Sequence, residues 1–356
     1  MSERPQSKGY IMKNVLSLFN GISGCHLALD RAGLSFGTVY YSEIDKYANA
    51  VTQHHYPNDI ALGDVTKWRE WDIDWSSIDL VGAGFPCQAW SVAGRQLGDK
   101  DERGMLFWTT LEIIAKVLKH NPDAKFLMEN VKMKKDFEQY ITHHTEQALG
   151  HVEKTLINSS LVSAQNRNRY YWTNFEVTQP SDKGILLKDI IEDGANAYGG
   201  AIRGRYNEDG TISQRLELNG MEKTNTLTTV QKDNVAVLRP ASIVGRRLNG
   251  RGVRDDYNKD VAITQCLQVK HKNDKTGCLT TVDKDNVLST EPPGRYPDIY
   301  NRGDISYRKL TPLECERLQT IPDNWTDCVS NTQRYKSIGN GWTIDVIAHI
   351  LKCAFK

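Results

Sequence analysis

The chain has 356 residues, a length that predicts one large domain accompanied by a smaller one. Apolar residues make up 39% and charged residues 25%, the composition of an ordinary globular protein whose core needs no disulfides. The formal net charge of +1 excludes a strongly basic protein, so a nucleic-acid surface would have to be local.

The seven cysteines form no CxxC pair, and their number is odd. Both facts argue against a disulfide framework and a zinc site, and they favour a reducing compartment. Residues 1–14 lack the apolar segment of a signal peptide, and no stretch approaches the length of a membrane span. We therefore expect a cytoplasmic protein that binds neither a metal ion nor a membrane.

The first half of the chain alternates short apolar runs, typical of buried strands, with longer helical patterns. The predicted strands are Val15–Phe19, Thr38–Glu43, Ile78–Gly84, Ala124–Asn130 and Arg169–Phe175. A glycine-containing turn after the first strand leads into a helix that ends near Gly33, and Met105–His120 is a second helix. This alternation predicts an α/β fold with a mostly parallel sheet and helices on both faces.

From about residue 176 the helical periodicity fades, and it returns at Pro312–Gln319 and Ile344–Cys353. We therefore predict a smaller, mainly β domain at 176–324, placed between two parts of the first domain, 1–175 and 325–356. Five arginines occur between Arg239 and Arg254 with no acid among them. This cluster is either a nucleic-acid surface or a solvated loop.

The predicted β domain contains an internal repeat. KTNTLTTVQKDNV, residues 223–235, recurs as KTGCLTTVDKDNV at 275–287, and IRGR at 202–205 is echoed by IVGR at 243–246. Two copies are too few for a solenoid. Leu-Thr-Thr-Val favours strand and Lys-Asp-Asn favours turn, so a strand-turn-strand unit is duplicated at about 201–238 and 242–288.

A glycine-containing turn, FNGISG at Phe19–Gly24, stands between a predicted strand and a helix. Glycines there let the backbone approach a ligand at the carboxyl edge of a sheet. Glu43 ends the next strand, 22 residues after Gly21, a position that suits a carboxylate binding ribose hydroxyls. Asp64 is placed to accept from an adenine amino group. The alternative is a structural turn with surface acids.

Cys87 follows the strand Ile78–Gly84, within GFPCQAWSVAG, and therefore belongs to the same edge. Pro86 stiffens the preceding turn, which favours a nucleophile at Cys87, although a buried structural cysteine is the alternative. The polar segment 94–104 has the composition of a loop that closes over a substrate.

Glu129 and Asn130 end another predicted strand at that edge. A partly enclosed carboxylic acid there can donate a proton, while a helix-capping acid is the alternative. Arg167 and Arg169 stand two residues apart in QNRNR, and they face one side if a strand begins there. Paired guanidinium groups suit carbonyl or phosphate oxygens.

Taken in chain order, these elements resemble those of the DNA cytosine-5 methyltransferases. The matching elements are FNGISG, Glu43, Gly63-Asp64, Pro86-Cys87-Gln88, Arg103–Phe107, Glu129-Asn130-Val131, Gln165 with Arg167 and Arg169, Arg308–Gln319 followed by Pro322-Asp323, and Gly339-Asn340. The matches span Phe19 to about Val346. Each element alone is weak, but their common order is specific. The stretch without a match, about 176–306, falls where this family carries its target-recognition domain.

The resemblance implies a Rossmann-like fold that uses S-adenosyl-L-methionine and releases S-adenosyl-L-homocysteine. Cys87 would attack carbon 6 of a cytosine, and Glu129 would bind or protonate ring N3. Arg167 would hold the cytosine O2, and Arg169 would position Cys87 or the backbone. The residues carried over as cofactor contacts are Phe19, Gly21, Gly24, Glu43, Asp64, Pro86, Leu106, Asn340 and Gly341.

The resemblance also implies a monomeric bacterial or phage enzyme, associated with the nucleoid, that acts on double-stranded DNA. The target base must be flipped out of the duplex, because its carbon 5 cannot be reached within the stack. The expected DNA contacts are Gln88, Ser91, Gln96, Arg103, Arg246, Arg247, Thr280 and Thr281. The repeat is either a pair of reading units or a duplicated structural hairpin.

Two other functions remain open at this point. One is an RNA cytosine-5 methyltransferase of the same fold, against which the long middle segment argues, because a DNA-reading enzyme needs a large recognition domain. The other is a catalytically inactive DNA-binding relative, against which the intact Cys87, Glu129 and Arg167 argue.

Overall fold

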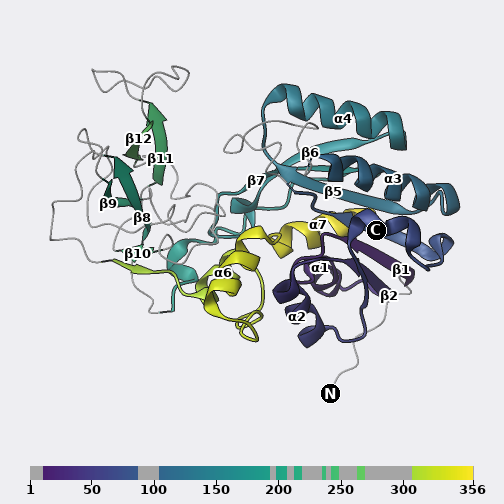
Figure 1. Cartoon of the computed structure of the whole chain (residues 1–356), viewed down its shortest axis with the longest axis horizontal. Helices are drawn as coiled ribbons and strands as arrows, with labels where there is room; N and C mark the ends of the chain where they lie inside the picture. The colour runs from purple at the N-terminus through teal and green to yellow at the C-terminus, as the bar shows by residue number, and fades with distance from the viewer. Residues whose placement is uncertain are drawn as a thin grey trace. The chain divides into compact units, whose positions relative to one another are not determined.

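The computed structural model describes residues 11–86, 104–192, 198–206, 212–218, 235–237, 242–247, 263–268 and 307–355. The chain divides into two compact units (Figure 1). The first comprises Met1–Ile157, Asn168–Pro180 and Ile344–Lys356, and the second comprises Asn158–Arg167 and Ser181–Thr343. These limits differ from the domain boundaries expected from the sequence, since residues 325–343 group with the second unit. The division of function between domains stays a prediction.

The first unit is built on a seven-stranded sheet with the order β3-β2-β1-β4-β5-β7-β6. Its strands are β1 (Ile11–Leu18), β2 (Ser35–Ser42), β3 (Ile60–Gly63), β4 (Ile78–Ala83), β5 (Lys125–Val131), β6 (Glu153–Asn158) and β7 (Asn168–Thr173). β3, β2, β1, β4 and β5 pair in parallel, whereas β7 pairs antiparallel with β5. The expected mostly parallel α/β sheet is therefore confirmed.

Five α-helices accompany this sheet among the described residues: α1 (Gly24–Ala32), α2 (Lys46–His55), α3 (Met105–His120), α4 (Lys135–Leu149) and α7 (Ile344–Ala354). α1 packs against α7, and α3 packs against α4 (Figure 1). All six residues of β4 are buried, as expected of a central strand covered on both faces. Burial of both faces of β4 leaves the ends of the parallel strands as the positions for a ligand.

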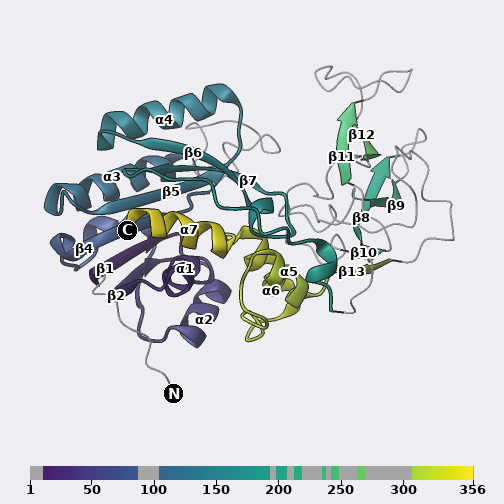
Figure 2. The same cartoon turned by 180° about the vertical axis from the view of Figure 1, so that it is seen from behind.

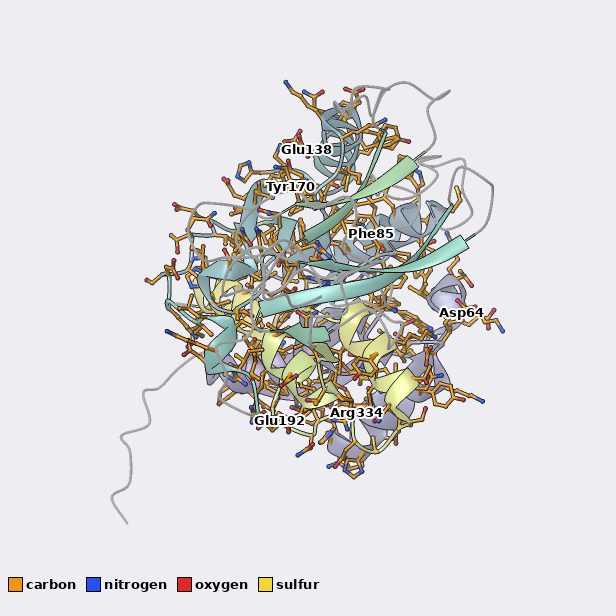
Figure 3. All side chains as sticks on the ribbon, turned by 90° about the vertical axis from the view of Figure 1, so that its left-hand side faces the viewer. Asp64, Phe85, Glu138, Tyr170, Glu192 and Arg334 are labelled. Atoms are coloured by element: carbon orange, nitrogen blue, oxygen red, sulfur yellow. The ribbon has the colours of Figure 1, made fainter. Side chains whose placement is uncertain are left out.

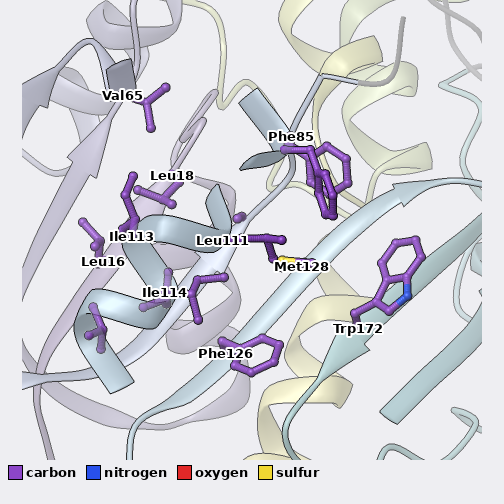
Figure 4. Close-up of a cluster of buried hydrophobic side chains, with 14 of the residues drawn as sticks. Leu16, Leu18, Val65, Phe85, Leu111, Ile113, Ile114, Phe126, Met128 and Trp172 are labelled. Carbon is purple, nitrogen blue, oxygen red and sulfur yellow. The ribbon is translucent and has the colours of Figure 1, made fainter. Parts of the chain in front are cut away.

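The hydrophobic core between the sheet and α3 is formed by alternate residues of the strands. Leu16 and Leu18 of β1 pack with Phe126 of β5 and with Leu111 and Ile114 of α3 (Figure 4). Val15 and Leu127, which stand next to cluster residues in the same strands, are also buried but do not belong to this cluster. Because strand side chains alternate between faces, each strand is held from both sides and its carboxyl end is fixed in place.

The second unit contains antiparallel strand pairs and two α-helices in its described part (Figure 2). The strands are β8 (Tyr198–Tyr206), β9 (Ile212–Leu218), β10 (Val235–Val237), β11 (Ser242–Arg247), β12 (Ile263–Gln268) and β13 (Tyr307–Lys309), and the helices are α5 (Pro312–Leu318) and α6 (Asn331–Asn340). They form a sheet with the order β13-β10-β8-β9 and a separate pair, β11-β12.

Short 3-10 helices occur in both units. They occupy Val65–Glu70 and Trp75–Ser77 in the first unit, and Ser159–Leu161 and Leu187–Asp189 in the second.

None of the helices in the described ranges is long and apolar enough to span a bilayer. Within the same ranges, no three histidine, cysteine or acidic side chains gather as metal ligands would.

Candidate active site

The carboxyl ends of the five parallel strands bring the sequence motifs to one edge of the sheet. The turn Phe19–Gly24 follows β1, Glu43 follows β2, and Asp64 follows β3. Gly84–Pro86 follows β4, and Glu129 lies near the end of β5. The order of the strands reverses between β1 and β4, which is where open α/β sheets bind their ligands. The turns after β1 and β4 flank that point.

The turn after β1 has an unusual backbone. Phe19, Gly21 and Ser23 have φ angles of 55°, 55° and 65°, which only glycine adopts without steric cost. The surrounding structure over-determines this conformation, because the buried Thr52 hydroxyl of α2 bonds the side chains of both Asn20 (3.1 Å) and Ser23 (2.8 Å). Backbone strain that is held so firmly is typical of a binding turn.

Glu43 ties this turn to the end of β2. Its Oε2 accepts from the Gly21 N–H at 2.8 Å, and its Oε1 accepts from the N–H groups of Ile44 and Asp45, each at 2.8 Å. A carboxylate has about four acceptor positions, so these three bonds within the described residues leave room for about one hydroxyl donor. Glu43 therefore shapes the turn and can still bind a sugar.

The amino end of α1 follows directly and begins at Gly24. No side chain caps it, and no acid stands in its first turn. Uncapped N–H groups at the start of a helix suit a carboxylate or another anionic group of a ligand. The turn after β1 therefore offers a ligand a hydrogen-bond acceptor, the Glu43 carboxylate, and hydrogen-bond donors, the N–H groups at the start of α1.

The remaining residues expected to contact a cofactor lie in different places. Asp64 caps the following 3-10 helix, since its Oδ1 accepts from the N–H and the hydroxyl of Thr66 at 2.9 and 2.8 Å (labelled in Figure 3). Leu106 is partly buried at the start of α3, and Pro86 ends the turn after β4. Asn340 and Gly341 belong to the second unit.

Asn130 connects the end of β5 to the turn after β4. Its buried amide donates to the Phe85 carbonyl at 3.1 Å, and its Oδ1 accepts from the Val131 N–H at 2.8 Å. Phe85 is buried against Phe107 of α3, with ring centroids 5.5 Å apart. The turn that leads to Cys87 is thus fixed by two elements.

Several residues singled out in the sequence lie outside the described residues, namely Cys87, Gln88, Ser91, Gln96, Arg103, Thr280 and Thr281. Arg246 and Arg247 are residues of β11.

Glu129 forms a buried ion pair with Arg169. The Arg169 Nε lies 2.9 Å from the Glu129 Oε1, and the two residues are 9% and 8% exposed. The antiparallel pairing of β7 with β5 brings them together, because it places Val131 opposite Arg169 and Glu129 opposite Tyr171. An enclosed carboxylate is thereby held beside a fixed cation, near the turn that Asn130 holds.

Arg167 does not share this arrangement, because β7 begins at Asn168 and the alternation of the strand does not include it. Its guanidinium donates to the carbonyl oxygens of Gly341 at 2.9 Å and Gly339 at 3.4 Å, and the residue is 4% exposed. Within the second unit, Arg167 therefore holds the backbone around Asn340, a candidate cofactor residue.

Gln319 holds the same backbone, and sequence reasoning gave it no role beyond its place in a motif. Its Nε2 donates to the carbonyls of Ile338 (2.9 Å) and Gly341 (3.1 Å), and its Oε1 accepts from the Thr343 hydroxyl (2.8 Å). The residue is fully buried. Its one signal in the sequence was its position at the end of RKLTPLECERLQ.

Two other residues of that motif are structural. The buried Glu316 accepts from the N–H groups of Asn324 (2.7 Å) and Thr326 (2.8 Å), and from Arg334 of α6, which is labelled in Figure 3, at 3.0 Å. Glu314 completes a capping box with Thr311 at the start of α5. Glu314 and Glu316 thus stabilise α5 and the loop that follows it, and Gln319 lies where that helix ends.

The cysteines differ in their suitability as nucleophiles, because the thiolate is the reactive form. Cys25 lies in the core, where burial raises the pKa of its thiol to about 12. Cys315 is also fully buried. Cys328 is exposed, but it follows the loop after α5, in the second unit. In the described part of the first unit the cysteines are Cys25 of α1 and Cys353 of α7, and neither follows directly on the carboxyl end of a strand, as the turn before Cys87 does.

Comparison with known proteins places the whole chain in one family. Residues 13–356 match the C-5 cytosine-specific DNA methylase family. The chain is 30% identical over 353 residues to the type II methyltransferase M.NlaX of Neisseria lactamica, which covers 95% of each protein. It is 28% identical over 346 residues to the type II methyltransferase M1.ScrFI of Lactococcus lactis subsp. cremoris, which covers 94% of this chain and 75% of the relative.

A solved structure shares the fold. The DNMT2 variant of Spodoptera frugiperda superimposes with a TM-score of 0.56 at 18% sequence identity, covering 97% of this chain and all of the other. At that identity the likeness concerns the fold alone.

We expect Arg169→Ala to lower the free energy of unfolding by about 3 kcal/mol, because it leaves the buried Glu129 without its cation. Denaturant unfolding followed by circular dichroism measures the change. Arg69→Ala is the matched control, since it breaks an exposed ion pair with Glu112 and costs less than about 1 kcal/mol. Equal losses in the two variants would show that the pair is not buried in solution.

Proposed function

The chain belongs to the C-5 cytosine-specific DNA methylase family and is an enzyme that methylates cytosine in DNA, and we propose that it does so through a covalent bond from Cys87 to a flipped-out base. The methyl donor is S-adenosylmethionine. The observation that carries the proposal is the single sheet edge that holds the turn after β1, the turn leading to Cys87, and the Glu129–Arg169 pair. The names of the relatives, type II methyltransferases, support the same reaction.

The residues of the first unit fit the methyl donor. Glu43 has an acceptor to offer a ribose hydroxyl, and the uncapped start of α1 suits the carboxylate of an amino acid. The glycines of the turn after β1 allow the backbone to approach such a ligand closely. When bound, the donor supplies an electrophilic sulfonium methyl group, and S-adenosylhomocysteine is the product.

The pyrimidine needs activation because its carbon 5 is a weak nucleophile. The Cys87 thiolate adds to carbon 6, which breaks the 5,6 double bond and directs its electron pair to carbon 5. Carbon 5 then forms a bond to the methyl group, while the bond from that methyl group to the donor's sulfur breaks and returns its electron pair to the sulfur. Loss of the carbon-5 proton to a base restores the double bond and expels the thiolate. Covalent catalysis thus divides one difficult substitution into easier steps.

Glu129 and Arg169 support the addition step. We assign Glu129 the hydrogen bond or proton at ring N3, which keeps negative charge from accumulating on the base. Arg169 fixes the orientation of that carboxyl group through its 2.9 Å contact. Each residue of the pair is less than a tenth exposed, so little water surrounds it. This strengthens both the Glu129–Arg169 ion pair and the assigned hydrogen bond from Glu129 to ring N3.

Arg167 was expected to hold the cytosine O2. Its bonds to the carbonyls of Gly339 and Gly341 support a positioning role, in which it and Gln319 fix the backbone around Asn340 and Gly341, two of the residues carried over as cofactor contacts. Two donors on the same Gly341 oxygen allow little movement of this turn.

DNA recognition would fall to the second unit and to the segment after Cys87. A base must leave the helix to meet Cys87, at a cost of a few kcal/mol. The segment from Gln88 to Arg103 is suited by composition to cover the flipped base. The strands of the second unit are the candidates for reading the target sequence in duplex DNA.

We expect Cys87→Ala to lower methyl transfer to duplex DNA by at least about a thousandfold, because the variant cannot form the carbon-6 bond. Transfer of a tritiated methyl group measures activity, and a mobility-shift assay should show that DNA binding is retained. Cys328→Ala, which removes an exposed thiol that belongs to none of the matching motifs, should behave as the unaltered enzyme. Unchanged activity in Cys87→Ala would remove Cys87 from the mechanism.

We expect Gln319→Met to raise the KM for S-adenosylmethionine by roughly tenfold, since a side chain of similar volume removes about 1–2 kcal/mol of buried hydrogen bonding from the turn at Gly341. The Kd for DNA should stay within about twofold. Gln333→Met on α6 is the control, because the Gln333 side chain does not bond this turn. A parallel loss of affinity for both substrates would indicate general unfolding and contradict a positioning role.

A further inference from the structure

Thr52 is a polar residue on the buried face of α2, the helix that lies beside α1 (Figure 1). The buried residues of α2 are Ala48, Val51 and Thr52, which is the spacing of a single helical stripe. A buried hydroxyl group is costly unless it finds hydrogen-bond partners. The partners of the Thr52 hydroxyl therefore indicate why a threonine occupies this position.

These partners differ from those of other helical threonines. The hydroxyls of Thr110, Thr142 and Thr145 donate at 2.7 to 2.8 Å to the carbonyls four residues earlier in their own helices. Such a bond is the ordinary way in which a threonine within a helix satisfies its hydroxyl. In the described part of the chain, every bond of the Thr52 hydroxyl goes instead to the turn after β1.

The turn uses the full capacity of this hydroxyl. Thr52 accepts from the Asn20 amide at 3.1 Å and from the Ser23 hydroxyl at 2.8 Å, and its own proton is directed to the Gly21 carbonyl at 3.5 Å. Asn20 is also held by Ser17, whose hydroxyl donates to the Asn20 Oδ1 at 2.8 Å. The four side chains are buried, so water does not compete for these bonds.

The bonds of Thr52 reach the turn on both sides of its ligand-binding groups. The Gly21 N–H donates to Glu43 at 2.8 Å, while the Gly21 carbonyl accepts from Thr52. Ser23 directly precedes Gly24, where α1 begins without a side-chain cap. Thr52 thus links the residue that Glu43 holds to the residue from which α1 starts.

Ser23 shows that this link has a conformational cost. Its φ angle of 65° lies in the left-handed region, where glycine is favoured over residues that carry a side chain. A serine is tolerated at such an angle when its hydroxyl makes a bond that glycine lacks, and here that bond goes to Thr52. Strain that is held in this way at a binding turn indicates a role in the function of the turn.

We propose that Thr52 is a positioning residue for the methyl donor, because its hydroxyl fixes the separation between Glu43 and the start of α1. This inference rests on the proposed function, since it takes a nucleoside joined to an amino acid as the ligand. A fixed separation favours a ligand that binds both groups at once, because less ordering is needed on binding. A nucleoside alone reaches only Glu43 and gains nothing from it.

Thr52→Val tests the proposal, because it keeps the size and shape of the side chain and removes the hydroxyl. We expect the variant to bind S-adenosylhomocysteine about tenfold more weakly than the unaltered enzyme, without DNA present. Its affinity for adenosine should change by less than about twofold. Isothermal titration calorimetry measures the first Kd, and a titration followed by ligand NMR signals measures the second.

Two further variants control for the loss of a buried hydrogen bond. Thr52→Ser keeps the hydroxyl and should bind S-adenosylhomocysteine within about twofold of the unaltered enzyme. Thr145→Val removes a fully buried hydroxyl that bonds the Ile141 carbonyl of its own helix, α4. It should lower the midpoint of denaturant unfolding, as Thr52→Val does, and leave both ligand affinities unchanged.

Ser23→Gly tests the same link if Thr52→Val folds poorly. It removes one bond to Thr52 and adds no backbone strain, because glycine readily adopts a φ angle of 65°. We expect the affinity for S-adenosylhomocysteine to fall by about threefold to fivefold, the effect of one hydrogen bond, and the affinity for adenosine to stay the same.

Normal binding of S-adenosylhomocysteine by folded Thr52→Val would overturn the proposal. So would an equal loss of affinity for S-adenosylhomocysteine and adenosine, which would assign Thr52 a general structural role. In either case the unaltered enzyme still binds S-adenosylhomocysteine, and the proposed function stands. If the unaltered enzyme does not bind S-adenosylhomocysteine, the proposed function fails first, and the role of Thr52 fails with it.

Discussion

The hydrogen bond from the Asn130 amide to the Phe85 carbonyl joins the two strand ends on which the proposed chemistry depends. One end leads to Cys87, and the other carries Glu129. A thiolate that attacks one atom of a pyrimidine and a carboxyl group that serves another atom of the same ring must keep a fixed separation. A buried bond between neighbouring parallel strands meets that need, because the sheet and the core under Phe85 hold both ends.

In the second unit, buried side chains hold a turn in place by donating hydrogen bonds to its backbone carbonyls. Arg167 and Gln319 both donate to Gly341, and Thr343 completes the set by donating to Gln319. These residues come from QNRNR, from the end of α5 and from the segment before α7, which lie far apart in the sequence. These three segments meet at one turn. This explains why segments without a chemically reactive residue are among the matching motifs. Glu316 and Arg334 extend the same support beneath the loop after α5.

Much of the first unit was predictable from hydrophobic periodicity. The predicted helix Met105–His120 agrees with α3, and the predicted strands agree with β1, β2, β4 and β5 within a few residues. The direction of β7 was not predictable, because an apolar run carries no information about parallel or antiparallel pairing. The helices α2 and α4 were not predicted either, because both sequences are polar overall, although each has an apolar face, and both helices depend on tertiary packing.

The pairings at the site were harder to predict than its location. Because parallel strands end at one edge of a sheet, the sequence alone indicated that Glu43, Glu129 and the turns after β1 and β4 lie at the same edge. Which arginine meets Glu129 depends on the register of β7 against β5, and a shift of two residues would put Arg167 in the place of Arg169.

The most direct measurement traps the covalent bond between Cys87 and the base. Duplex DNA is prepared with 5-fluorocytosine at a position that bisulfite sequencing has shown to be methylated, and it is incubated with the enzyme and S-adenosylmethionine. Fluorine at carbon 5 cannot be removed as a proton is, so the adduct persists after methyl transfer. We predict a denaturation-resistant protein–DNA species whose linked peptide contains Cys87. Methylation of ordinary DNA without such a species, or a link through another residue, would contradict the account.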